Sequence, residues 1–206
     1  MKKGDEKMVK PILFNTEMVR AILEGRKTVT RRLVKPQPNS TFDKNWECFT
    51  KENGEVVVLT KPYSPGDILY VREAFCPNYF DREIANFYCD GNRTAYKADF
   101  DSEKFGDVVP EPKWKPSIHM PKAMARIFLR VTDVRVERLQ EMTAADAYAE
   151  GLRYEEEGTQ REVLHRFSSL WDSTVKKESV AQYGWNASPW VWVVGFEKVE
   201  GGTDVK

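Results

Sequence analysis

The sequence has few of the residues that build disulfide frameworks and metal sites. It contains three cysteines, Cys48, Cys76 and Cys89, and no two of them have CxxC spacing. Its two histidines, His119 and His165, stand far apart. Such sparse and uneven counts argue against both a disulfide framework and a zinc finger. We therefore expect the thiols to lie in the core of a protein from a reducing compartment, with no metal site and no cofactor.

Long apolar runs and an excess of one charge are missing as well. No stretch approaches the roughly 20 apolar residues that a membrane-spanning helix requires. The polar start of the chain leads into no signal-peptide core, so we expect a cytoplasmic location. Lys plus Arg and Asp plus Glu both number 32, which gives a formal net charge of zero. This balance excludes a whole-surface polyanion binder, and any contact with nucleic acid must come from a local basic patch.

The chain is long enough, at 206 residues, to bury a core without help from disulfides or metal. We predict polar tails at 1–9 and 200–206 around one domain at 10–199. An insertion at about 76–118 is rich in Asp, Asn, Gly and Pro, and we place one short strand in it, at 94–98. It is too apolar for a disordered linker, because it holds the aromatic residues Tyr79, Phe80, Phe87, Tyr88 and Trp114.

Strands dominate the remaining pattern. A long β region is predicted to begin near Ala125 and to continue through Val136, because Ile127, Leu129 and Val131 alternate with Phe128, Arg130 and Thr132. Further strands are predicted by short β-branched or apolar runs at 11–14, 56–60, 68–73 and 190–196. The turn residues at 53–54 indicate a hairpin tip before the second of these.

Three helices are predicted from helical spacing and capping residues. The first covers 16–24 and ends at Gly25, and the second begins after Thr143 and ends at Gly151. The third covers 160–173 with a buried stripe formed by Val163, Leu164, Phe167, Leu170 and Trp171. Because strands outnumber these short helices, we predict an α+β fold, a small mixed β-barrel with covering helices.

A basic run follows the end of the first helix. Its cations lie within ten residues with no acid among them, namely Arg26, Lys27, Arg31, Arg32 and Lys35. Such a run is typical either of a solvated turn or of a site for an anion or a nucleobase. An extended chain would place Lys27 and Thr30 on opposite sides, whereas a tight turn after Gly25 would bring them together. In the second case Thr30 becomes a possible nucleophile with Lys27 as its base.

Glu150 is a second candidate, since it lies at the C-terminal end of the helix that begins after Thr143. The helix dipole disfavours a carboxylate there, so Glu150 is either a surface residue or the partner of a cation such as Lys27. The same position is occupied by Glu24 at the end of the first helix, so the placement is not unique.

Weaker candidates for site residues lie at two other strand boundaries. Arg72 and Glu73 end a strand after a Pro-Gly-Asp turn, where an ordinary strand end and a site are both possible. His119 and Lys122 introduce the long strand together with Arg126, and His119 could form a wall of a base-binding site. Aromatic residues near the C-terminal strand could stack on bases or pack in the core, namely Tyr183, Trp185, Trp190 and Trp192.

These residues resemble the ASCH domain family of the PUA-like superfold. The family's G-x-K-x-x-T-x-R motif is matched at each fixed position by the eight residues from Gly25 to Arg32. Other blocks resemble the longer, phage- and prophage-associated ASCH proteins, and they lie in the expected order at 65–73, 117–121, 131–139 and 186–192. The resemblance covers roughly 11–198. It implies a PUA-like β-barrel that acts on or binds RNA or nucleosides.

The resemblance also implies roles for individual residues. Some small bacterial members remove the acyl group from N4-acetylcytidine, and others have been linked to RNA cleavage. In the amidohydrolase pattern the motif Lys and Thr, here Lys27 and Thr30, act with a Glu seven residues after a helix-capping Thr, here Glu150. Thr30 would attack the amide, Lys27 would take its proton, and Arg32 would stabilise the oxyanion.

Three functions remain open at this point. Catalysis needs Lys27, Thr30 and Glu150 close together, whereas RNA binding needs only a basic, aromatic-lined surface. For the latter we expect contacts from Arg26, Arg31, Arg32, Arg72, Glu73, His119, Lys122 and Arg126. The third possibility is a phage accessory protein that binds another protein. The chain is about twice as long as the small amidohydrolases, so the insertion could reshape their site.

Overall fold

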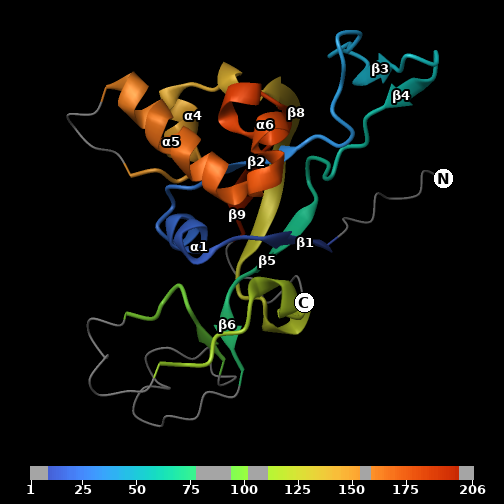
Figure 1. Ribbon diagram of the computed structural model, residues 1–206. Helices are drawn as coiled ribbons and strands as arrows, with labels where there is room; N and C mark the ends of the chain where they lie inside the picture. Colours follow the sequence, from blue (N-terminus) through green and yellow to red (C-terminus); the bar gives the residue numbers. More distant parts are fainter. Residues whose placement is uncertain (1–8, 78–93, 102–110, 154–158, 200–206) are drawn as a thin grey trace, which may run out of the picture. The chain divides into compact units, whose positions relative to one another are not determined.

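A computed structural model describes residues 9–77, 94–101, 111–153 and 159–199 of the chain (Figure 1). Apart from Val9, the predicted polar tails lie outside these ranges, and so does Cys89. The predicted insertion is described only in part, because Tyr79, Phe80, Phe87 and Tyr88 lie outside the described residues. Helices and mixed strands together give an α+β fold, as predicted.

The chain divides into two compact units, each assembled from separated segments. The first unit contains 1–25, 67–130 and 198–206, and the second contains 26–66 and 131–197. The boundary between Arg130 and Val131 falls inside strand β8 (Phe128–Arg138), so one strand contributes to both units. The single domain predicted for 10–199 therefore remains a prediction.

The first unit is built on three strands and one helix. Strand β1 (Val9–Leu13) pairs in parallel with β5 (Ile68–Arg72), and β5 pairs antiparallel with the first three residues of β8. Helix α1 (Thr16–Leu23) begins after Asn15, whose side chain accepts a hydrogen bond from the N–H of Met18 at 2.8 Å. It ends at Gly25, whose φ of +78° suits a residue without Cβ.

Short elements complete the first unit. Strand β6 (Phe75–Cys76) pairs antiparallel with β7 (Ala95–Tyr96), which is the strand predicted at 94–98 in shorter form. Two 3₁₀ helices follow, η1 (Ser117–His119) and η2 (Lys122–Met124). The core beneath these elements is formed by Ile68, Phe75, Tyr96, Met120, Ala125 and Phe128.

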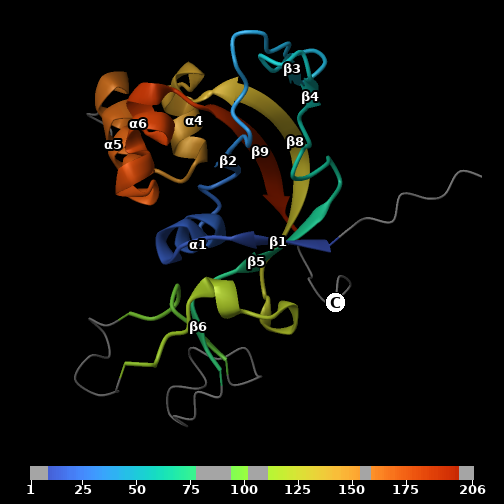
Figure 2. The same cartoon turned by 45° about the vertical axis from the view of Figure 1, so that its right-hand side comes forward.

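The second unit is built around β8, β9 (Trp190–Lys198) and β2 (Val29–Leu33), which are neighbours in that order. Figure 2 shows β8 and β9 as long curved strands. Strand β2 pairs antiparallel with β9, so that Thr30 lies opposite Val194 and Arg32 opposite Trp192. The second half of the basic run, from Val29 onward, is therefore a strand. The pairings described do not by themselves close a barrel, and the barrel remains a prediction.

The second unit also contains three α-helices and three 3₁₀ helices among its described residues, several of which pack against Val191 and Val193 of β9. They are α4 (Ala144–Ala149), α5 (Gln160–Thr174) and α6 (Val180–Tyr183), with the 3₁₀ helices η3 (Leu139–Glu141), η4 (Lys177–Ser179) and η5 (Trp185–Ala187). Their core contains Leu139, Met142, Ala147, Val163, Phe167, Val191 and Val193. The predicted cap of α4 is confirmed, since Thr143 accepts a hydrogen bond from the N–H of Asp146. Leu170 was wrongly assigned to the buried stripe of α5, because it is 39% exposed.

A two-stranded hairpin also belongs to the second unit. Strand β3 (Cys48–Thr50) pairs antiparallel with β4 (Val56–Val58). The hairpin tip predicted at 53–54 is confirmed by the φ of +81° at Gly54. The strand predicted at 56–60 ends earlier, at Val58, and β3 was not predicted because its residues lack a clear alternation.

Candidate functional site in the second unit

The site is built where the chain between α1 and β2 meets the end of α4. Lys27 forms a β-bridge with Glu150, and the N–H of Thr28 donates to the carbonyl of Ala149 at 2.9 Å. The Arg26 guanidinium donates to the carbonyl of Gly151. These backbone contacts fix the start of the basic run against the helix end, which is why Lys27 and Glu150 face each other.

The Lys27 side chain is buried and held by three acceptors. Its Nζ donates to Oε2 of Glu150 at 2.5 Å, to the carbonyl of Glu150 at 2.8 Å and to the carbonyl of Val29 at 2.8 Å. Its exposed fraction is 0%, and that of the Glu150 side chain is 7%. A protonated amine has three N–H donors, so these contacts match the needs of a buried ammonium group. Of the two alternatives left open for Glu150, a surface residue or the partner of a cation, the contacts correspond to the second.

Burial also lowers the pKa of Lys27. Removal from water is the largest cause, and the charges of Arg32 and Arg31 lower it further. The carboxylate of Glu150 acts in the opposite direction but does not outweigh burial. The amine consequently loses its proton more readily than an exposed lysine.

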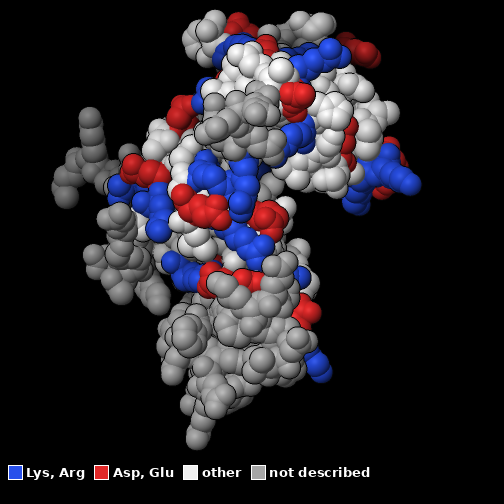
Figure 3. Space-filling view, turned by 90° about the vertical axis from the view of Figure 1, so that its left-hand side faces the viewer, with Lys and Arg blue, Asp and Glu red and all other residues white. Residues whose placement is uncertain are grey.

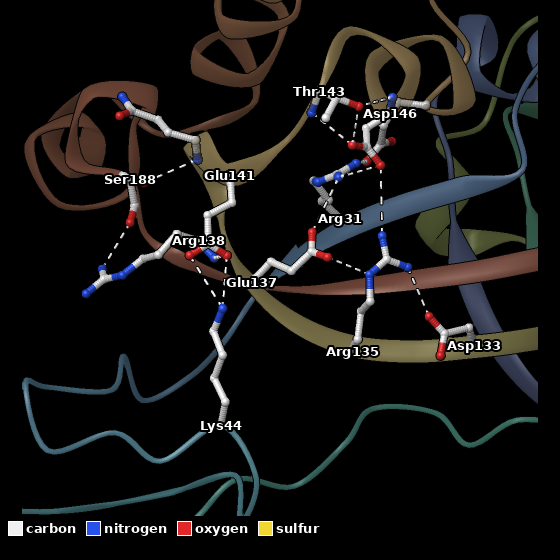
Figure 4. A network of polar contacts seen from close by, with 12 residues as sticks. Arg31, Lys44, Asp133, Arg135, Glu137, Arg138, Glu141, Thr143, Asp146 and Ser188 are labelled. Atoms are coloured by element: carbon white, nitrogen blue, oxygen red, sulfur yellow. Dashed lines mark hydrogen bonds and ion pairs between the residues drawn. The ribbon is translucent and has the colours of Figure 1, made fainter.

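Arg31 lies among three carboxylates, as Figure 4 shows for two of them. Its guanidinium nitrogens lie 3.4 Å from Glu150, 3.4 Å from Asp146 and 3.7 Å from Glu137. The side chain is only 1% exposed, and its Nε and Nη2 atoms have no hydrogen-bond partner within the described residues. The positive charge of Arg31 is thus compensated by acids from α4 and β8.

Asp146 has two roles in this arrangement (Figure 4). Its carboxylate accepts hydrogen bonds from the N–H and the hydroxyl of Thr143 at 2.8 and 2.7 Å, which complete the helix cap. Burial raises the pKa of Asp146, but the hydrogen bonds from Thr143 and the charge of Arg31 outweigh it and leave that pKa lowered. The helix cap therefore keeps a negative charge beside Arg31.

Thr30 and Arg32 lie on β2 next to this ion-pair cluster. The hydroxyl of Thr30 is fully buried, at 0% exposure, and accepts a hydrogen bond from Nη1 of Arg32 at 2.5 Å. The same nitrogen donates to the carbonyl of Arg31 at 2.9 Å. Arg32 is half-buried, and burial lowers its pKa even though Glu150 and Tyr63 favour its charge. Arg32 is accordingly the motif cation that lies closest to the threonine hydroxyl.

The sequence predicted a local basic patch at this run, and the contacts of Lys27 and Arg31 differ from that prediction. Lys27 and Arg31 are buried with acidic partners instead of facing solvent, because β2 runs beside α4 and β8. The face drawn in Figure 3 likewise shows lysine and arginine side chains interspersed with acidic ones. Lys27, Arg31 and their acidic partners thus form a nearly neutral cluster. Sequence reasoning missed Glu137, and it assigned Asp146 only to the helix cap.

The remaining candidates form a separate cluster in the first unit. The Arg126 guanidinium makes a two-pronged contact with Glu73, at 2.9 and 3.1 Å, and also binds Asp99. It lies 3.9 Å from the ring centroid of Tyr96. Burial lowers the pKa of Arg126, but the hydrogen bonds from both carboxylates outweigh it and raise that pKa. These residues were singled out from two different strand boundaries, and Asp99 was missed.

The other predicted residues of the first unit are Arg72, His119 and Lys122. The guanidinium of Arg72 donates to the carbonyl of Ile118, beside His119. The Nε atom of Arg72 is buried without a hydrogen-bond partner among the described residues. His119 and Lys122 are exposed.

The described ranges contain neither a membrane-spanning helix nor a cluster of metal ligands. None of their helices combines the length and apolar character needed to span a bilayer. No three His, Cys, Asp or Glu side chains in these ranges come together as a metal-binding group. Cys48 and Cys76 are free thiols, both half-buried.

Comparisons with known proteins do not assign the chain to a family. No family model matches the chain, and no curated protein matches it. Among solved structures, a crystal structure of an ASCH domain from Lactobacillus crispatus JV V101 is similar to 93% of this chain and 79% of that chain. The TM-score is 0.36 and the identity is 13%. Values this low do not establish a common fold.

Proposed function

We propose that this chain is an ASCH-type domain with a PUA-like barrel, of the longer phage-associated kind, and that its second unit acts on acylated nucleosides. The observation that carries the proposal is the buried pair of Lys27 and Glu150, whose Nζ and Oε2 atoms lie 2.5 Å apart. The motif resemblance implied a Lys and a distant Glu acting together, and these two residues meet. Thr30 lies three residues from Lys27, with its hydroxyl held by Arg32.

The proposed reaction is hydrolysis of the amide of an N4-acylated cytidine in two steps. Burial lowers the pKa of Lys27, so its amine gives up a proton to solvent more readily than an exposed lysine and can react in its neutral form. That amine takes the hydroxyl proton of Thr30 while Oγ1 bonds to the acyl carbon. The carbon–nitrogen bond then breaks, and Lys27 returns the proton to the leaving exocyclic nitrogen. Water hydrolyses the acyl-threonine by the reverse proton route.

Arg32 supplies the charge that this reaction needs. Its Nη1 lies 2.5 Å from Oγ1 of Thr30, so it is within reach of an oxyanion that forms on the attacked carbon. Because Thr30 has 0% exposure, the Arg32 side chain would have to turn from the hydroxyl toward the substrate carbonyl. This movement would free the nucleophile and bring the guanidinium to the developing charge.

The nearly neutral cluster favours an uncharged ligand over a nucleic-acid backbone. Lys27 and Arg31 already face Glu150, Asp146 and Glu137, so their charges are not free to neutralise phosphates. Binding of RNA through phosphates needs uncompensated cations. A nucleoside, or one splayed nucleotide, fits this balance better.

A non-catalytic nucleoside-binding site is the second candidate. It is favoured by the three acceptors around Nζ of Lys27, which suit a permanently protonated amine. In this case Lys27 would position the strand and Arg32 would contact the ligand. The two candidates differ in whether the bound nucleoside is hydrolysed.

The test is turnover of N4-acetylcytidine, followed by chromatographic separation of cytidine and acetate. We expect hydrolysis by the wild type and a loss of at least about 100-fold in kcat for Thr30→Val, as for removal of a nucleophile. Thr28→Val is the matched control, because Thr28 is exposed in the same run. Equal turnover in Thr30→Val and wild type would exclude the nucleophile. Binding without turnover in equilibrium dialysis would favour the second candidate.

A further inference from the structure

The outer edge of β4 is an open strand edge. In the hairpin, the N–H of Lys51 donates to the carbonyl of Glu55 at 2.8 Å, and the N–H of Leu59 donates to that of Glu47 at 2.7 Å. With this register, the odd-numbered residues of β4 direct their peptide groups toward β3. The peptide groups of Val56 and Val58 therefore point away from β3. Within the described ranges, no other strand pairs with them.

The opposite edge of the hairpin is closed. The N–H and carbonyl of Cys48 exchange hydrogen bonds with Asp43 at 3.3 and 2.9 Å. The N–H of Thr50 donates to the hydroxyl of Thr41 at 2.8 Å, and its carbonyl accepts from the amide of Asn39 at 2.7 Å. The preceding loop thus satisfies β3, and the two edges of the hairpin differ.

The side chains of β4 do not protect its open edge. Val56 is 60% exposed and Val58 is 67% exposed, and both lie on one face of the hairpin. Figure 1 shows this hairpin apart from helices α4, α5 and α6 of the same unit. Natural edge strands usually carry lysine, proline or a bulge that prevents pairing with another chain. Strand β4 itself contains only valines, so its backbone edge is open to a further strand, and Lys61 and Pro62 follow only after the strand has ended.

We propose that a second copy of this chain occupies the edge, with β4 pairing antiparallel to β4 about a two-fold axis at Val58. In this register Val56 lies opposite Thr60 of the second copy, and Glu55 lies opposite its Lys61. Opposite charges that face each other across an antiparallel pair are stabilising. The strand is therefore complementary to itself in both backbone and charge.

The charges of the hairpin select this register. Within one copy, Glu55 pairs with Lys51 at 2.9 Å and Lys61 pairs with Glu47 at 2.9 Å. When two copies join at Val58, Glu55 of one copy lies between its own Lys51 and Lys61 of the second copy. Positive and negative side chains then alternate across the two hairpins. A shift of two residues would place Glu55 opposite an apolar residue and would lose both new ion pairs. Because these lysines already have acidic partners, a polyanion is a poorer occupant.

The first test is sedimentation velocity over a range of protein concentrations. We expect a weak dimer whose fraction rises with concentration, because few residues form the contact. Val58→Lys places two lysines opposite each other at the axis, and we expect it to remain monomeric. The matched control is Ile118→Lys, which changes a residue that is 60% exposed in the first unit. This control is expected to dimerise like the wild type.

The second test separates the register from local damage to the hairpin. Glu55→Lys alone places lysines opposite lysines in the dimer, and Lys61→Glu alone places glutamates opposite glutamates. We expect each variant to be at least about tenfold weaker in self-association, equivalent to 1.4 kcal/mol. An equimolar mixture restores both opposite-charge pairs without repairing the intrachain ones, so a heterodimer is expected.

Either of two results would overturn the proposal. One is a wild-type protein that stays monomeric up to its solubility limit, which would leave an extended strand of another protein as the occupant. The other is a Val58→Lys variant that dimerises as well as the wild type, which would place the dimer contact elsewhere. Thermal unfolding of each variant checks that the hairpin substitutions leave the fold intact.

Discussion

The Nζ atom of Lys27 lies 2.5 Å from Oε2 of Glu150, although 123 positions separate these residues in the sequence. The contact joins the segment before β2 to the end of α4, and both side chains are buried. Glu150 also lies 3.4 Å from Arg31, so one carboxylate compensates two buried cations. The site depends on this glutamate both for its stability and for its proposed chemistry.

Replacement of Glu150 by Gln should strongly destabilise the protein. The change leaves Lys27 and Arg31 buried without their shared carboxylate, and loss of one partner of a buried pair costs roughly 3–5 kcal/mol. The free energy of unfolding, measured in urea, gives the cost. Glu17→Gln is the control, since Glu17 pairs with Arg20 on the surface and is 74% exposed. Its expected cost is at most about 1 kcal/mol. Equal costs for the two variants would contradict the assignment.

The lowered pKa of Lys27 predicts a stability contribution that rises with pH. Between its folded-state pKa and the value of about 10.4 in the unfolded chain, the unfolded state binds more protons. The free energy of unfolding contributed by Lys27 must therefore increase as pH rises through this window. The measurement is the difference in unfolding free energy between the wild type and Lys27→Met, from neutral pH upward. A difference that stays constant or falls would show that the pKa of Lys27 is not lowered.

Binding of a nucleoside should depend little on salt. Lys27 and Arg31 are compensated by acids, and an uncharged ligand releases no counterions. A plot of log Kd against log salt concentration should be nearly flat for N4-acetylcytidine. For a single-stranded RNA that bound through phosphates, the logarithm of the association constant would fall with log salt concentration, with a slope of about −0.7 per phosphate contact. A steep slope with RNA would favour backbone contacts from cations outside the buried cluster.

Replacement of Arg126 by Lys should destabilise the first unit. A lysine keeps the charge but cannot form the planar two-pronged contact with Glu73 while also binding Asp99. It would also lose the stacking of the guanidinium on Tyr96. We expect a loss of roughly 1–3 kcal/mol in unfolding free energy, and Arg130→Lys, an exposed neighbour on β8, serves as control. Equal stability of the two variants would argue against a packed guanidinium.

Local signals in the sequence were enough to predict much of the secondary structure. Thr143 with Asp146 and the final Gly151 defined α4, because capping needs only residues a few positions apart. Alternation in β8 and the apolar run of β9 were also readable, since burial repeats along a strand. Strand β2 was not decided, because both an extended chain and a turn are compatible with its basic residues.

The sequence by itself determined which residues could carry chemistry, through the motif from Gly25 to Arg32 and the helix-end position of Glu150. The tertiary structure alone decided that Lys27 and Arg31 of this run are compensated. Glu137 comes from β8 and Asp146 from α4, and both meet Arg31 only because these elements pack beside β2. Charge compensation depends on distances of a few ångströms between residues remote in sequence, and local periodicity does not encode such distances.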